Sequence, residues 1–160
     1  MQRNYTFLAC VYGLFVVTMR CITYVAVYNC LYAISRRLYE SKELVEKVLL
    51  EIVDLIPSGW QYPEFACARI IYEEQEYKCQ DFKETPWKQS CDLLLKGEKV
   101  GLLEVYYLEE KPAGDEGPFL KEEIILLQAI ADQLTAGGVV TGHGGRWHPS
   151  TVQRLIQRRQ

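Results

Sequence analysis

Histidine is nearly absent from this chain of 160 residues: its two copies, His143 and His148, both lie near the C-terminus. A nucleophile–histidine pair is therefore excluded from residues 1–142. The two histidines have no third ligand beside them in the sequence, which argues against a metal site. No glycine-rich phosphate loop is present either. We therefore predict that the chain is not an enzyme and that it carries no metal and no cofactor.

Cysteine occurs six times, but no two copies form a Cys-x-x-Cys motif. They occupy apolar or strand-like surroundings, without the density of a secreted disulfide scaffold, at positions 10, 21, 30, 67, 79 and 91. We interpret them as free thiols in a reducing compartment. A redox or metal role for Cys67, Cys79 and Cys91 is the alternative.

Acidic residues are missing from both ends of the chain: residues 1–37 and 143–160 contain eight arginines and no acid. These eight leave ten of the 18 Lys and Arg residues for the middle, against all 21 acidic residues. A body as acidic as this is not expected to bind nucleic acid. Contact with DNA would have to come from the basic C-terminal tail, through Arg154, Arg158 and Arg159.

Charge is also scarce over residues 5–34, where Arg20 separates two apolar runs. The first run has 15 residues, fewer than the roughly 20 that cross a bilayer. The two runs together are long enough, but Arg20 would then lie near the membrane centre, at a cost of about 2.5–3.5 kcal/mol. Three interpretations stay open: a membrane segment, a helix packed within protein, and an atypical start that belongs to no folded unit.

Apolar residues recur at helical spacing in two later segments. In the first segment, Ser41 can interrupt the helix and the stretch 57–59 ends it. In the second, Gly137 and Gly138 end the helix. The stripe residues are Ile34, Leu38, Val45, Leu49, Ile52 and Ile56 in the first segment, and Leu120, Ile124, Leu127, Ala131 and Leu134 in the second.

Between these helices the residues alternate or run apolar in the manner of strands. A hairpin loop at 96–99, with Gly97 at the bend, separates the last two of them. We therefore predict an α+β fold: an antiparallel sheet of about four to six strands flanked by N- and C-terminal helices, with an extra apolar N-terminal helix. The expected strands are residues 65–74, 77–83, 88–95 and 100–110.

Several separated motifs of the body point to one family: GWQYPE, CARI, FKETPWKQS, GEKVG, EVYYLEEKP and DEGPFLKEE. Over about residues 31–135 they resemble a GAF-type sensor domain, of the compact variety found beside PAS domains in two-component sensor histidine kinases. The resemblance implies a GAF-like twisted sheet with terminal helices that join in a dimer. It also implies signal reception rather than catalysis, since the kinase core of such proteins has no counterpart in this sequence.

Aromatic and polar side chains gather around the predicted start of the sheet. The alternative to a pocket there is that Trp60 and Trp87 simply pack over a sheet edge. A small-ligand pocket would use aromatic walls and a few polar groups, and its tentative residues are Trp60, Tyr62, Arg69, Trp87, Gln89 and Tyr106.

The chain thus divides into an apolar segment 1–30, a sensor domain 31–137 and a basic tail 138–160 with a short helix. We expect a non-catalytic sensory module: a homodimer through its terminal helices, with a small-molecule ligand and a sensor kinase as partner. Its expected location is the cytoplasm, free or anchored to a membrane through residues 5–34. Two other hypotheses stay open, a truncated domain remnant without output and a DNA-associating protein.

Overall fold

The computed structural model describes the backbone of residues 3–40 and 45–136, and the side chains of residues 22–40 and 45–136. The predicted α+β fold is confirmed in this part of the chain. The predicted tail, residues 138–160, lies outside it. In chain order the elements are α1 (Arg3–Glu40), α2 (Val45–Leu55), the 3₁₀ helices η1 (Ile56–Gly59) and η2 (Pro63–Phe65), β1 (Ala66–Tyr72), β2 (Gln75–Lys78), β3 (Lys88–Leu95), β4 (Glu98–Tyr107) and α3 (Lys121–Ala136).

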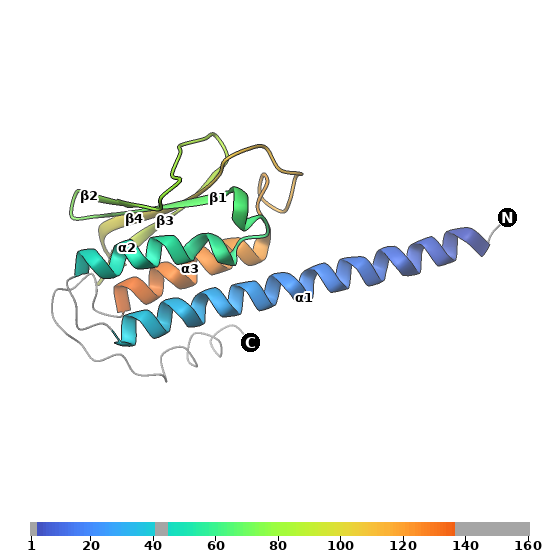
Figure 1. Ribbon diagram of the computed structural model, residues 1–160, viewed down its shortest axis with the longest axis horizontal. Helices are drawn as coiled ribbons and strands as arrows, with labels where there is room; N and C mark the ends of the chain where they lie inside the picture. Colours follow the sequence, from blue (N-terminus) through green and yellow to red (C-terminus); the bar gives the residue numbers. More distant parts are fainter. Residues whose placement is uncertain (1–2, 41–44, 137–160) are drawn as a thin grey trace.

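The strands form one antiparallel sheet of four, in the order β2-β1-β4-β3. This number lies within the predicted range of four to six. The three helices all lie on one side of the sheet (Figure 1). We call that side the helix face and the other side the open face. Because side chains alternate along a strand, each strand sends every second residue to the open face.

Two tight turns set the register of the outer strands. Lys96 and Gly97, with φ of 52° and 87°, join β3 to β4 where the sequence predicted a bend at Gly97. Glu73 and Glu74, with φ of 49° and 66°, join β1 to β2 in the same left-handed conformation. Neither glutamate is a typical residue for such a turn, so the boundary predicted between strands 65–74 and 77–83 was wrong.

The strand expected at residues 77–83 is shorter in the structure, where β2 begins at Gln75 and ends at Lys78. A turn follows, closed by a hydrogen bond of 3.1 Å from the Phe82 N–H to the Cys79 carbonyl oxygen. The chain then has no strand until Lys88. We call residues 79–87 the covering segment.

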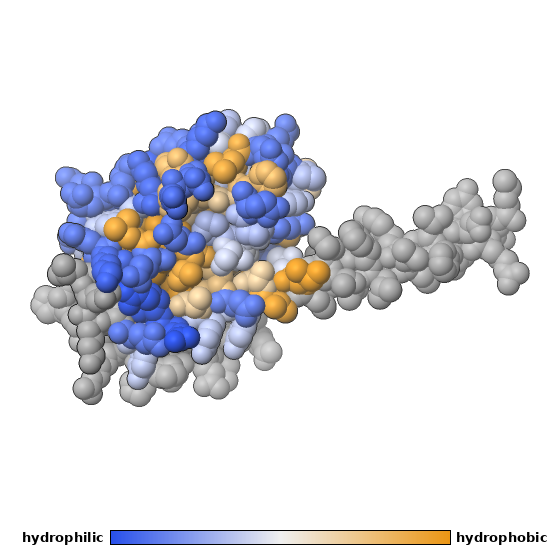
Figure 2. All heavy atoms as spheres, viewed as in Figure 1, coloured by the Kyte–Doolittle hydropathy of each residue, from blue (hydrophilic) through white to orange (hydrophobic). Residues whose placement is uncertain are grey.

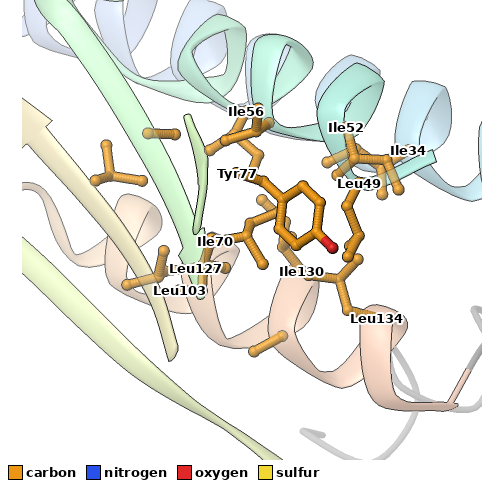
Figure 3. Packing of buried hydrophobic residues seen from close by; sticks show 14 of the residues in the cluster. Ile34, Leu49, Ile52, Ile56, Ile70, Tyr77, Leu103, Leu127, Ile130 and Leu134 are labelled. Atoms are coloured by element: carbon orange, nitrogen blue, oxygen red, sulfur yellow. The ribbon is translucent and has the colours of Figure 1, made fainter. Parts of the chain in front are cut away.

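The hydrophobic core lies between the helix face of the sheet and the helices (Figure 3). The predicted stripe of α3 is confirmed at Leu127, Ala131 and Leu134, whereas Leu120 and Ile124 are only half-buried. The largest aliphatic side chains that are fully buried are Ile34, Leu49, Ile52, Ile56, Ile70, Leu93, Leu103, Leu126 and Ile130.

Helix α1 is continuous over 38 residues, so the boundary predicted after residue 30 does not interrupt it. Cys30, Ile34 and Leu38 are buried at a spacing of four, on the side that packs against α3 and η1. The N-terminal half of α1 extends past the body of the domain (Figure 1). Within the part of the chain whose side chains are described, no helix is both long and apolar enough to cross a membrane. The side chains of residues 5–21, half of the predicted membrane segment, lie outside that part.

Candidate functional site

An arginine at the middle of the sheet is the centre of the candidate site. Arg69 on β1 is directly opposite Glu104 on β4. Its neighbours Ala68 and Ile70 belong to the core on the helix face, so Arg69 points to the open face. Glu104 is in turn opposite Ser90 on β3. The charged pair therefore lies on the two central strands of the sheet.

The guanidinium of Arg69 is held on three sides. Its Nε donates to Glu104 Oε2 at 2.9 Å, and its Nη2 donates to the Tyr106 hydroxyl oxygen at 3.0 Å. The Tyr106 hydroxyl donates in turn to Glu104 Oε2 at 2.9 Å. Lys88 Nζ donates to the other carboxylate oxygen, Glu104 Oε1, at 3.2 Å. Glu104 thus accepts from both cations and from the phenol.

The remaining nitrogen of Arg69 contacts the covering segment. Nη1 donates to Glu84 Oε1 at 2.6 Å and lies 3.4 Å from Glu76 Oε1. The side chain of Glu84 is 63% exposed, whereas those of Arg69 and Glu104 are 11% and 2% exposed. The site therefore has a buried inner pair and outer partners that water reaches, namely Glu84, Glu76 and Lys88.

Burial and charge act in opposite directions on this cluster. Burial alone would raise the pKa of Glu104, but hydrogen bonds from Arg69, Tyr106 and Lys88 outweigh it and hold the pKa below its usual value. Burial, together with the hydrogen bond to Glu104, raises the pKa of Tyr106 to about 12. Both groups therefore keep their usual protonation states at neutral pH.

The covering segment is fastened over the cluster by its side chains. The Phe82 ring meets the Tyr106 ring edge-on, with centroids 5.4 Å apart, and the Arg69 Cζ atom lies 5.3 Å from the Phe82 centroid. The Thr85 hydroxyl donates to the Tyr107 carbonyl oxygen at 2.6 Å. These contacts enclose the cation without burying Glu84.

The six predicted site residues are divided by the sheet. Arg69 and Tyr106 lie together on the open face, as described above. The other four lie on the helix face or its rim, where Trp60 Nε1 donates to Gln89 Oε1 at 3.4 Å. Tyr62 meets the Tyr107 ring edge-on, and Trp87 packs partly buried against the core. The structure therefore does not bring the six into one pocket.

The Trp60–Gln89 contact belongs to the core. Trp60 is 1% exposed, and the Gln89 Nε2 atom is buried without a hydrogen-bond partner. The alternative that Trp60 packs as a structural residue describes this geometry better than a pocket wall does. Trp87 is less buried but joins the same cluster.

A buried carboxylate that sequence reasoning missed lies at the start of α3. Glu123 is fully buried and accepts from the Gln61 N–H, the Leu120 N–H and the Tyr107 hydroxyl, each at 2.7 Å. Glu123 thus connects α3 both to the loop that follows η1, through Gln61, and to β4, through Tyr107. The available signal was its place three residues after Leu120, the residue that precedes α3, where a glutamate caps free N–H groups.

Comparisons with known proteins give no relative: no protein-family model, curated protein or solved structure matches the chain. Within the described side chains, no group of three or more His, Cys, Asp or Glu residues could hold a metal ion.

Proposed function

We propose that this chain is a non-catalytic sensory module of the GAF type, in which the open face of the sheet receives a small carboxylate ligand. The observation that carries the proposal is the ion pair between the exposed carboxylate of Glu84 and the otherwise enclosed guanidinium of Arg69. The resemblance of residues 31–135 to GAF-type sensor domains supports the same function.

The geometry explains why a carboxylate fits. An arginine guanidinium binds planar, two-oxygen anions best, and Glu84 already presents such a group to Nη1. The Glu84 side chain is 63% exposed, so a ligand carboxylate can reach the position of its Oε1 atom from solvent and replace it. Glu104 stays paired with Arg69 in either case. Glu84 thus acts as an internal substitute for the ligand.

The two central strands offer a route to the helices. Arg69 and Glu104 face the ligand side, while their neighbours Ile70, Leu103 and Val105 are buried against the helix layer. A ligand that prefers one arrangement of these strands shifts the helix layer toward the packing that suits it. We propose that the shift reaches α1 and α3, the terminal helices of the sensor domain.

The outer side of α1 is the proposed dimer surface. Val25, Tyr28, Tyr32 and Tyr39 are exposed on α1 at spacings of three, four and seven, the spacing of helices that pair lengthwise. The rings of Tyr28 and Tyr32 are stacked, with centroids 6.4 Å apart. Figure 2 shows apolar surface where α1 leaves the body. Ile22 and Val25 are exposed apolar residues of α1. A second copy of the chain would cover this surface.

The double substitution Tyr28→Glu and Tyr32→Glu is expected to convert the dimer to a monomer. Each chain would place two charges into the apolar contact, where like charges face each other. Both positions are exposed, at 65% and 60%, so the fold itself should survive. Light scattering on the full chain measures the change. Leu50→Glu, at an exposed leucine of α2, is the control and should leave the dimer intact. A wild-type monomer at high concentration would contradict the dimer.

Glu84→Gln is expected to tighten binding of succinate, a simple dicarboxylate probe, by up to about fivefold. The substitution removes the competing internal carboxylate without disturbing the buried pair. Isothermal calorimetry on the full chain measures both affinities. Glu110→Gln, at another exposed glutamate, is the control and should change nothing. No succinate binding to either protein, or equal binding to both, would contradict the proposed ligand class.

We propose that the module lies in the cytoplasm and acts upstream of a sensor kinase. The four cysteines with described side chains are all free, which supports a reducing compartment. Membrane contact through residues 5–34 stays a prediction. The rival role of Arg154, Arg158 and Arg159 in DNA contact falls on residues outside the described part.

A further inference from the structure

Two cysteines, Cys67 and Cys79, lie near each other at the start of the covering segment. Cys67, on the open face of β1, is 1% exposed, and Cys79, directly after β2, is half-buried. The Cys79 N–H donates to the Ala68 carbonyl oxygen at 3.2 Å, which puts Cys79 opposite the residue that follows Cys67. Cys67 and Cys79 are therefore offset by one residue across the two strands, and neither is in a disulfide.

The Cys79 sulfur accepts a hydrogen bond from the backbone. It accepts from the Ala68 N–H at 3.2 Å, and the backbone N–H of Asp81 also lowers its pKa. Donors of this kind stabilise the thiolate, which is the reactive form of cysteine. Asp54 of α2 is the charged group that opposes them. The neighbouring Cys67 side chain is the largest cause of a pKa of Cys79 lowered to about 7, and the pKa of Cys67 is raised in return.

We propose that Cys67 and Cys79 form a peroxide-reactive dithiol site, in which Cys79 attacks and Cys67 resolves. Its oxidant is a hydroperoxide small enough to enter beside the half-buried Cys79. A partly exposed thiolate with a second thiol one residue away across the strand pair is an arrangement that allows reversible oxidation.

In the overall reaction, two thiols and one hydrogen peroxide give one disulfide and two waters, with transfer of two electrons. The Cys79 thiolate attacks one oxygen of hydrogen peroxide; the O–O bond breaks, and the leaving hydroxide takes a proton to become water. Cys79 is then a sulfenic acid. The Cys67 thiol gives up its proton and attacks the Cys79 sulfur; the S–S bond forms, the S–O bond breaks, and the second hydroxide leaves as water. Both cysteines are oxidised and the peroxide is reduced.

The backbone suits such a bond. Neighbouring strands lie about 4.8 Å apart and residues along a strand about 3.3 Å apart, so a pair offset by one residue has a Cα separation of about 6 Å. This separation lies within the usual range of Cα–Cα distances in disulfides.

Oxidation would also change the cover of the candidate site. The Cys67 thiol donates to the Lys83 carbonyl oxygen at 3.4 Å, and a disulfide removes that hydrogen bond. The next residue, Glu84, is the outer partner of Arg69. The covering segment is therefore expected to loosen on oxidation. Only this consequence rests on the proposed ligand site; the thiol chemistry does not.

The test is peroxide treatment of the full chain, followed by peptide mapping without reductant. We expect one major intramolecular disulfide, between Cys67 and Cys79, which a reducing agent reverses. Cys67→Ser should stop at a sulfenic acid on Cys79 that dimedone traps, and Cys79→Ser should give neither product. Cys91→Ser is the control and should behave as the wild type. Preferential oxidation of Cys30 or Cys91, or no 67–79 disulfide, would overturn the proposal.

Alkylation rates give a second measurement that a merely structural pair would not alter. Iodoacetamide should label Cys79 at pH 7 at least about fivefold faster than Cys91, since the pKa of Cys79 is lowered and that of Cys91 is raised, while lower nucleophilicity offsets part of the gain. In Cys67→Ser the pH profile of Cys79 labelling should change. An unchanged profile would remove Cys67 from the site. Succinate binding is independent of these results, so failure of the ligand proposal is recognised separately.

Discussion

Trp60→Ala is expected to lower the free energy of unfolding by about 3–5 kcal/mol. Trp60 is among the largest fully buried side chains, and its removal leaves a cavity between the helix layer and the sheet. It also leaves the Gln89 side chain, already short of one partner, without the indole N–H. Since small domains have only about 5–15 kcal/mol in total, much of the stability would be lost. Urea unfolding followed by far-ultraviolet circular dichroism measures it.

Two comparisons make this result interpretable. Trp60→Phe keeps most of the ring volume and is expected to cost less, mainly the hydrogen bond to Gln89. Trp87→Ala removes a tryptophan that is only partly buried and should cost about 1–2 kcal/mol. Equal losses for Trp60→Ala and Trp87→Ala would contradict the central packing of Trp60.

Glu123→Ala is expected to lower the free energy of unfolding by about 3 kcal/mol or more. The substitution leaves three donors without their acceptor, and each such loss is about 1–3 kcal/mol. Glu123→Gln keeps one oxygen but turns an amide nitrogen toward a donor, so it should cost less than Ala and still be measurable. Glu122→Ala, one residue away, is the control and should stay within about 0.5 kcal/mol. A loss for Glu123→Ala no larger than this control would contradict its role as a fastener.

Glu123 is also expected to make the free energy of unfolding depend on pH. Burial raises the pKa of Glu123 above its ordinary value of 4.5, in spite of the hydrogen bonds that lower it. The folded state therefore binds this proton more tightly than the unfolded state does. The resulting stabilisation is complete below the unfolded pKa and is lost as pH rises through the folded pKa. Glu123→Gln should remove this contribution, which unfolding curves between pH 4 and 7 for the two proteins would reveal.

The helices and the sheet were predictable because their signals are local. The α3 stripe at Leu127, Ala131 and Leu134 follows from spacing alone. The β1–β2 turn was not predictable, since Glu73 and Glu74 lack the glycine or asparagine that marks a left-handed turn. Long-range pairing with β4 and β2 fixes the turn there, and no short stretch of sequence contains that information.

The candidate site needed a register that the sequence does not contain. Tyr106 and Tyr107 are adjacent, so alternation alone predicts that they face opposite sides of the sheet. Which of them joins Arg69 depends on how β1 pairs with β4. The covering segment was harder still, because its first residues have the alternation of a strand. Its turn at Cys79 places Phe82 and Glu84 over Arg69 and creates the thiol pair.

The length of α1 gives it the properties of a lever. A helix of 38 residues is about 57 Å long. Its buried anchor residues Cys30, Ile34 and Leu38 span only about 12 Å of that length. A tilt of a few degrees at the anchored end therefore moves the far end by several times the displacement at the core. A change in core packing too small to disturb the domain would be a large motion for anything attached near residue 3.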